Sequence, residues 1–253
     1  MYRSSNPALN DSTFQKSSYN KRNWWEDVES NLMTIEGVSE KTGILLLITA
    51  ITALVTAFSM PQSAPLIFIG AIGGFVIVLI VVFSQSTNPM LICTYAAFEG
   101  LFIGGITWYF EVLLDIPGIG ILAALLTFMI LGAMIIIYRA GLIRWDRNTR
   151  IAVMSSLFAI LLIYLISFIG AIFGFQIPLI HSAGPVGILF SLFVIGIGAL
   201  CLVADFDFIE RGVQMGAPKQ LEWRAAFGLM VTLIWLYIEI LELLAKIAIS
   251  SRR

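Results

Sequence analysis

Four acidic residues, Glu99, Asp205, Glu239 and Glu242, lie within or at the ends of strongly apolar stretches. An acid near the middle of a bilayer costs about 2.5–3.5 kcal/mol on insertion scales, so it is expected to face protein and to have a function. Acids in this setting handle protons or cations. We therefore treat these four as candidate pH-sensing or ion-pathway residues, with a purely structural role as the alternative for each.

Asp205 ends a row of mostly small residues that begins at Gly184 and continues through the segment "VGILFSLFVIGIGALCLVAD". Small residues on one helix face admit a close neighbouring helix, so Asp205 should point into a bundle rather than at lipid. Asp207, two positions further on, should face elsewhere and lie at the helix end near Arg211. The row follows steps of three and four: Gly184, Gly187, Ser191, Val194, Gly198, Cys201 and Asp205.

The last apolar segment has one polar stripe, in which Trp235, Glu239, Glu242 and Lys246 are spaced by four, three and four. Glu242 and Lys246 are placed to neutralise each other across one helical turn. Glu239 has no such partner in its own segment and needs one from another helix. Asp205 is the best candidate for that partner, and the stripe predicts that this helix is central.

A direct contact between Asp205 and Glu239 predicts specific chemistry. Two carboxylates in a poorly solvated site share a proton, because both cannot ionise cheaply. When both are ionised they repel each other and offer oxygen ligands to a hard cation such as Ca²⁺. The pair would then act as a pH switch that opens as the pH rises.

Glu99 lies halfway along "YAAFEGLFIGG", with Tyr95 and Phe102 at helical spacing and several glycines beside it. Two interpretations are equally open. It is either an acid that handles protons or cations, or a protonated acid bonded to a neighbouring helix.

The composition predicts an integral membrane protein. Hydrophobic residues make up 59% of 253 positions and charged residues 12%, against about 25% charged in ordinary soluble domains. The net charge of −1 gives no sign of nucleic-acid binding. The two cysteines lie in apolar segments and the chain has one histidine, so neither a disulfide framework nor a zinc site is expected. No cofactor is expected.

Seven stretches have the length of a membrane span, which predicts an all-α protein with seven transmembrane helices. We place them at about 43–59, 64–84, 89–110, 116–138, 151–173, 183–208 and 226–249. Most lysines and arginines fall in connectors on one side, so the positive-inside rule places the N-terminus in the cytoplasm. Residues 1–42 form a polar cytoplasmic tail, in which "WWEDVESNLMTIEG" is compatible with a short interfacial helix. Residues 43–253 form the membrane domain.

The segments "FEGLFIGG", "VADFDFIERG" and "WLYIEILELLAKI" resemble, in order and spacing, the acidic motifs of the Bax inhibitor family. "SNPALNDSTF" and "MTIEGVSEKTGILLLI" resemble the bacterial branch with a longer polar tail. The resemblance implies a bacterial inner membrane protein with a pH-sensitive calcium leak, and protection against cell death in eukaryotic members. It also implies that Asp205 and Glu239 form the di-acidic pH sensor, with Glu239 replacing the usual aspartate.

One departure separates this chain from the family pattern. Family members with leak activity have an arginine in the second helix that latches the acid pair, whereas residues 64–84 contain no basic residue. What replaces the arginine is open. One alternative function is a non-conducting scaffold or regulator of membrane protein quality control or stress survival, with membrane-protein partners bound through the tail. An intramembrane aspartyl hydrolase is disfavoured because "IGIGALCLVAD" lacks a Gly-x-Gly-Asp motif, so we expect no enzymatic activity and no catalytic residue.

Overall fold

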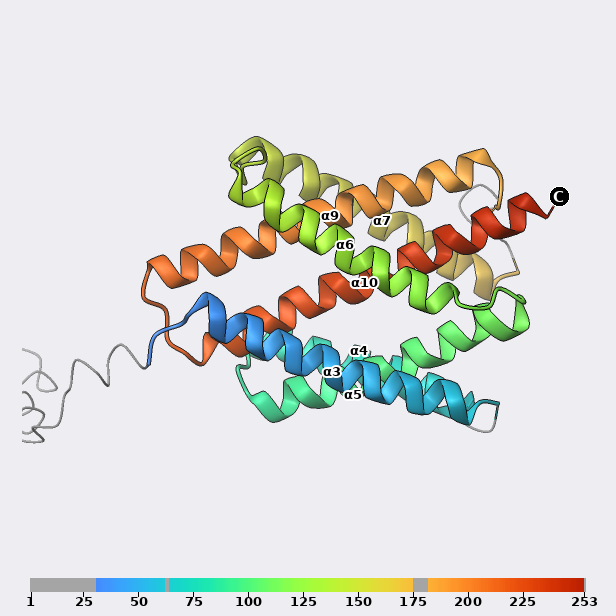
Figure 1. Ribbon diagram of the computed structural model, residues 1–253, viewed down its shortest axis with the longest axis horizontal. Coiled ribbons are helices and arrows are strands. Elements are labelled where there is room, and N and C mark those ends of the chain that lie inside the picture. The colour runs from blue at the N-terminus through green and yellow to red at the C-terminus, as the bar shows by residue number, and fades with distance from the viewer. Residues whose placement is uncertain (1–30, 62–63, 175–181, 253) are drawn as a thin grey trace, which may run out of the picture.

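The computed structural model describes residues 31–61, 64–174 and 182–252, and its regular elements are helices (Figure 1). In chain order they are α3 (Ile35–Ser59), α4 (Ala64–Ser84), α5 (Pro89–Trp108), the π-helical η1 (Tyr109–Leu113), α6 (Ile119–Arg139), α7 (Arg147–Ile172), α9 (Pro185–Gln214) and α10 (Leu221–Ser251). In these ranges, seven helices, with α5 and η1 counted as one, are long and apolar enough to cross a membrane. The predicted all-α, seven-span architecture is therefore confirmed.

Several helices begin at residues whose chemistry favours a start. The Thr34 side chain accepts a hydrogen bond from the Gly37 backbone N at 3.0 Å, which caps α3. Asn88 caps α5 in the same way, and Pro89 follows at the first helical position. Asp146 caps α7 by accepting from the Thr149 backbone N at 2.8 Å. Such caps satisfy amide groups that have no partner within the helix.

The helix boundaries differ from the sequence expectation mainly at the polar ends. α3 begins at Ile35, whereas we expected residues up to 42 to belong to the tail. α9 extends to Gln214 and α10 begins at Leu221, beyond the expected limits of 208 and 226. Hydropathy marks only the apolar part of a helix, while backbone hydrogen bonding continues into polar residues at its ends. The first half of the expected interfacial helix, residues 24–30, lies outside the described residues, and residues 35–37 of its second half belong to α3.

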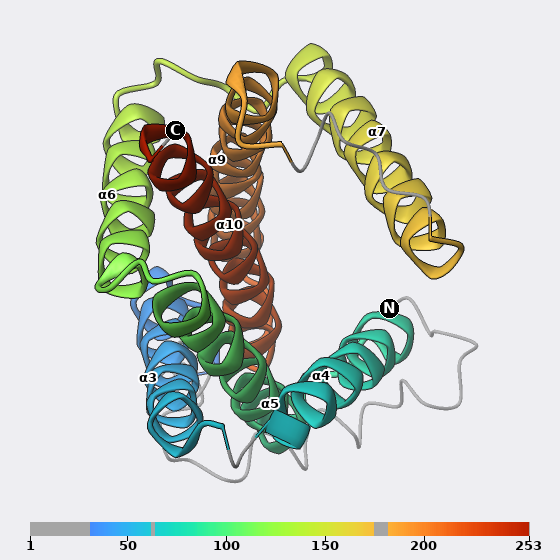
Figure 2. The ribbon, with the colours of Figure 1, turned by 90° about the vertical axis from the view of Figure 1, so that its right-hand side faces the viewer.

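Helix α10 is the central helix, as its polar stripe predicted. It packs against α3, α5, α6 and α9, and half of its most apolar window is buried. Figure 2 shows α10 surrounded by these helices, with α4 and α7 further out. The largest fully buried side chains include Met230, Leu236 and Leu241 of α10. The central position explains how this helix can hold polar groups away from lipid.

Glycines of α5 allow the close approach of its neighbours α3 and α4, against which it packs most extensively. A Cβ atom added at Gly100 would lie 1.8 Å from Oγ1 of Thr52 in α3. One added at Gly105 would lie 2.2 Å from Cγ1 of Ile67 in α4. The glycines beside Glu99 therefore set the packing of three helices.

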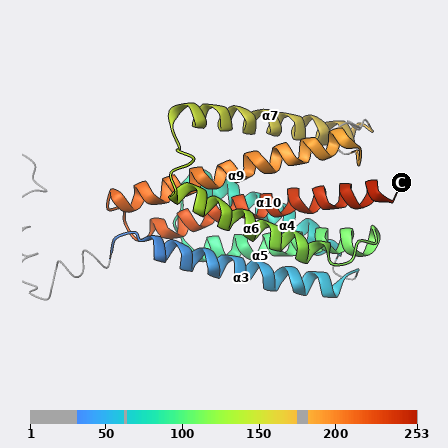
Figure 3. The same ribbon diagram turned by 45° about the horizontal axis from the view of Figure 1, so that its top comes forward.

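Helix α7 is peripheral and lies along the outer side of α9 (Figure 3). A small apolar cluster joins the two helices and consists of Val153, Ile160, Val194 and Ile197. Side chains of α7 otherwise point largely outwards, including Phe158 and Phe168. Helix α7 therefore makes few contacts with the rest of the bundle, and a polar contact can contribute much to its position.

Candidate functional site

Asp205 lies on the face of α9 that meets α10, as the small-residue row predicted. Along this row Ser191 and Val194 are buried, and a Cβ at Gly198 would lie 2.7 Å from Cδ2 of Leu236 on α10. The Asp205 carboxylate accepts a hydrogen bond from the Thr232 hydroxyl of α10 at 2.7 Å. The acid is therefore held inside the bundle by a neutral donor.

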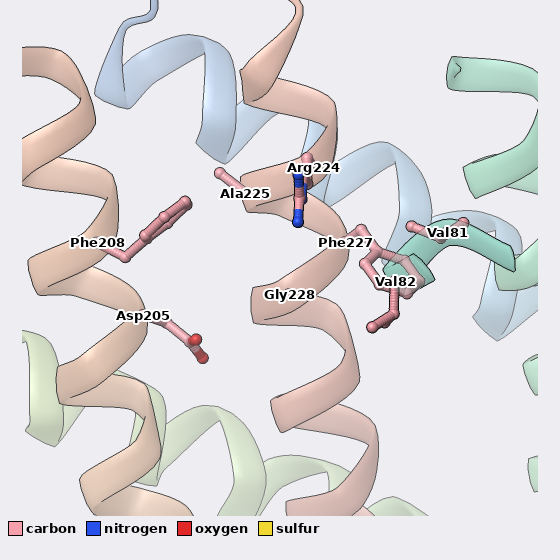
Figure 4. Close-up of a pocket in the computed structure, with 8 residues that line it drawn as sticks. All are labelled: Val81, Val82, Asp205, Phe208, Arg224, Ala225, Phe227 and Gly228. Atoms are coloured by element: carbon pink, nitrogen blue, oxygen red, sulfur yellow. The ribbon is translucent and has the colours of Figure 1, made fainter. Parts of the chain in front are cut away.

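The Asp205 carboxylate also faces a cavity of about 220 Å³ between α4, α9 and α10. Figure 4 shows its side chain extending from α9 towards α10, level with Gly228. A Cβ added at Gly228 would meet no atom within 4 Å, which agrees with open space at this position. The cavity is lined by Val81, Val82, Asp205, Phe208, Arg224, Ala225, Phe227 and Gly228.

Glu239 is buried, with 4% of its surface exposed. Its Oε1 atom accepts two hydrogen bonds, from the Tyr164 hydroxyl at 2.6 Å and from the Trp235 indole at 3.0 Å. Tyr164 belongs to α7, so the prediction that Glu239 needs a partner from another helix is confirmed. That partner is a tyrosine of α7.

The structure gives Asp205 and Glu239 separate hydrogen-bond partners and places no hydrogen bond between the two carboxylates. Thr232 and Glu239 are seven residues apart on α10, which corresponds to about 10 Å of helix rise. The expected shared proton between the two acids thus stays a prediction. Among the residues that the structure describes, no group of three or more His, Cys, Asp or Glu side chains could hold a metal ion, so the expected calcium site also stays a prediction.

Glu242 and Lys246 form the predicted ion pair across one turn of α10, at 2.8 Å. The Lys246 ammonium also donates to the Ser191 hydroxyl of α9 at 2.9 Å. Lys246 is 5% exposed and Ser191 is 1% exposed. A buried cation thus follows Glu239 along the same helix, between α10 and α9.

Glu99 lies apart from this group, on α5. Tyr95 lies one turn earlier in the same helix. A Cβ added at Gly74 of α4 would lie 3.0 Å from its Oε1 atom, so the acid points at α4. The Tyr95 ring packs edge-on against Phe227 of α10, with 4.9 Å between ring centroids. Both interpretations of Glu99 given by the sequence stay open.

Asp207 forms an ion pair with Arg211 one turn later, as expected for a helix-end residue. The split between Asp205 and Asp207 is thus confirmed. One acid faces α10 inside the bundle, and its neighbour pairs near the end of its own helix.

Sequence reasoning missed a buried ion pair between Glu222 and Lys41. Glu222 has no exposed surface, and its Oε2 atom lies 2.5 Å from the Lys41 ammonium. Its Oε1 atom accepts from the Thr34 backbone N at 2.9 Å and from the Thr34 hydroxyl at 3.1 Å. The pair joins the start of α3 to the start of α10. Assigning Lys41 to a solvated tail concealed it, and no local spacing relates residues 41 and 222.

The fold and the buried acids define a multi-pass α-helical membrane protein whose central helix is polar along one face. Comparison with known protein families matches residues 6–249 to the Bax inhibitor 1-like family. The match covers nearly the whole sequence, and the chain belongs to this family. Searches of curated proteins and of solved structures found no match.

Proposed function

We propose that this protein provides a pH-sensitive leak pathway for cations, Ca²⁺ in particular, along the face of α10 that meets α9 and α7. The observation that carries the proposal is the carboxylate of Asp205 at the wall of a cavity within the bundle. Asp205 lies nine residues before the end of α9, or about 14 Å along the helix. An acid at this depth beside open space is suited to bind a cation that has entered from the end of the bundle where α3 begins.

Polar groups continue from this cavity along α10. Thr232, Glu239 and Lys246 follow at intervals of seven residues, or two turns, and so extend over about 21 Å of a bilayer core of about 30 Å. Their partners on other helices come from α7 and α9. Intramembrane polar groups arranged in this way mark ion or proton routes in many membrane proteins.

The pH sensitivity follows from how the acids are held. The carboxyl groups of Asp205 and Glu239 each accept hydrogen bonds from neutral donors on neighbouring residues. These bonds hold the helices together in a closed state of the bundle. Ionisation of Asp205 on α9 and Glu239 on α10 places two negative charges inside the same bundle, where little solvent screens them. Their repulsion, and their attraction for a hard cation, favour opening as the pH rises.

Lys246 is the counter-charge that we assign to Glu239 and Glu242, whereas Arg224 of α10 lines the cavity beside Asp205. Helix α4 contains no basic residue, so it cannot supply a latching cation of its own. The Lys246 ammonium contacts Glu242 and Ser191 instead, one to two turns beyond Glu239. Electrostatic balance of the acids then comes from α10 itself.

The proposal is tested by Ca²⁺ flux into liposomes that hold a calcium-sensitive dye, with the purified protein reconstituted and the pH varied. Wild-type flux is expected to rise with pH, whereas Asp205→Asn and Glu239→Gln should each lower it and flatten its pH dependence. Asp207→Asn is the matched control, because it removes an acid two residues away that pairs at the helix end. Flux that is unchanged in both acid variants across the pH range would contradict the proposal.

A further inference from the structure

A second and larger cavity, of about 770 Å³, lies between α3, α5, α6 and α10. This volume falls within the range of ligand pockets in proteins, roughly 300–1,000 Å³. Its floor is formed by buried residues of the two inner helices, among them Ile103 of α5 and Leu233 and Ile234 of α10. Figure 2 shows α3 and α6 on one side of the molecule, with α5 and α10 nearer its centre. We call this cavity the α3–α6 groove.

The α3–α6 groove is open sideways, towards the lipid. Its rims contain Phe58 of α3 and Ile121 of α6, which are 86% and 70% exposed. Apolar side chains dominate the lining, and the small residues Ala50, Ala53 and Ala124 leave the space between the rims unfilled. A groove of this composition excludes water and accepts hydrocarbon.

The groove has the depth of one leaflet. Its shallow end lies at Glu111 and Gly120, where α5 has ended and α6 begins. Its deep end lies at Phe128, nine residues into α6, and at Leu46, thirteen residues before the end of α3. These distances correspond to about 14–20 Å of helix rise, or about half to two thirds of a bilayer core of about 30 Å. An acyl chain of a lipid in that leaflet covers the same depth.

Among the lining residues, the shallow end carries a negative group and no positive one, while the Arg252 guanidinium donates to the backbone carbonyls of Leu114 and Asp115 in the adjoining α5–α6 connection. Glu111 is the one ionisable residue among those that line the groove, apart from the Tyr237 phenol. Its Oε1 atom accepts from the Gly120 backbone N at 3.1 Å, which fixes the carboxylate at this end. The Tyr237 hydroxyl is bonded to Thr107 at 2.7 Å, so the deeper polar groups satisfy each other. The charge at the mouth therefore complements an ammonium group.

We propose that the α3–α6 groove binds one acyl chain of a membrane lipid whose amine-bearing headgroup, such as ethanolamine, lies at Glu111. The leaflet is the one that borders the α5–α6 connection. The site is separate from the acid row of α10 and does not depend on cation conduction. Lipid bound between α3 and α6 fills a space that the chain's own side chains leave open.

The test is native mass spectrometry of the full chain, purified in mild detergent with an equimolar mixture of phosphatidylethanolamine and phosphatidylglycerol. Wild-type protein is expected to retain one phosphatidylethanolamine in preference to phosphatidylglycerol. Ala124→Phe and, separately, Ala53→Phe place a ring in the groove and should each lower that occupancy about tenfold, because the ring takes the space of the acyl chain. Glu111→Gln should keep lipid binding but reduce the preference for the amine headgroup.

Ala159→Phe is the matched control, because Ala159 is an exposed residue of α7 away from the groove. Thermal unfolding of every variant in the same detergent shows whether the bundle is intact. Equal lipid retention by wild type, the two groove variants and the control would mean loosely associated bilayer lipid only and would overturn the proposal. Retention of phosphatidylglycerol in preference, unaffected by Glu111→Gln, would overturn the assignment of the headgroup.

Discussion

The hydroxyl of Tyr164 donates a hydrogen bond of 2.6 Å to Oε1 of Glu239, which bonds peripheral helix α7 to central helix α10 at a buried acid. The same oxygen accepts from Trp235 within α10. Beyond its apolar contact with α9, α7 makes few contacts with the bundle. The Tyr164–Glu239 bond is therefore a polar contact through which the charge state of Glu239 can act on the position of α7.

Tyr164→Phe removes this bond and leaves Glu239 with the Trp235 donor alone. A hydrogen bond to a charged or buried acceptor contributes about 1–3 kcal/mol, so we expect a loss of stability of that size. The measurement is equilibrium unfolding in detergent, followed by circular dichroism. Tyr109→Phe is the control, because Tyr109 is 47% exposed at the end of the bundle. Equal stability of the two variants would show that the Tyr164–Glu239 hydrogen bond does not stabilise the folded protein.

Lys41→Met should be severely destabilising, because it leaves Glu222 fully buried without its counter-charge. Breaking a buried pair by removing one partner costs about 3–5 kcal/mol, whereas replacing both partners by apolar residues is often neutral. We therefore expect Lys41→Met/Glu222→Met to recover most of the stability, as measured by thermal unfolding. Lys219→Met, at an exposed lysine of the α9–α10 connection, should change little. A double variant no more stable than Lys41→Met would count against the ion pair.

The sequence predicted the helical class, the central place of α10 and the orientation of Asp205, because each depends on periodicity within one helix. The Glu242–Lys246 pair was found for the same reason, since its spacing is local. Contacts between distant helices could not be predicted in this way. Glu239 bonds to Tyr164 and Glu222 to Lys41, and hydropathy and depth contain no information on which helix is the neighbour. Depth alone had suggested Asp205 as the partner of Glu239.

Helix α7 should lose its N-terminal cap on acidification. The backbone amide of Thr149 donates to the Asp146 carboxylate at 2.8 Å and thereby holds the pKa of Asp146 below its ordinary value of 3.8. Because the folded-state pKa is lowered, the stabilisation is complete above that ordinary value and is lost as the pH falls through the lower folded-state value. Amide hydrogen exchange at Thr149 should therefore show protection at neutral pH that Asp146→Ala removes. Asp146→Asn should retain much of it, since asparagine also caps helices. Unchanged protection in Asp146→Ala would argue against the cap.

Lys246→Met tests the part that the buried cation takes in the proposed leak. A fixed ammonium about 8 Å from a passing cation raises its energy by about 2 kcal/mol at an effective dielectric constant of about 20, so its removal should raise Ca²⁺ flux about tenfold or more. Glu239 and Glu242 would then also lack their nearest positive charge. Lys246→Arg keeps the charge and should leave flux close to wild type. The liposome assay with a calcium-sensitive dye measures both variants, and thermal unfolding checks that each is folded. Flux that is unchanged in a folded Lys246→Met protein would contradict this prediction. If Asp205→Asn still altered the pH profile, the cation pathway would lie away from Lys246 but would still include Asp205.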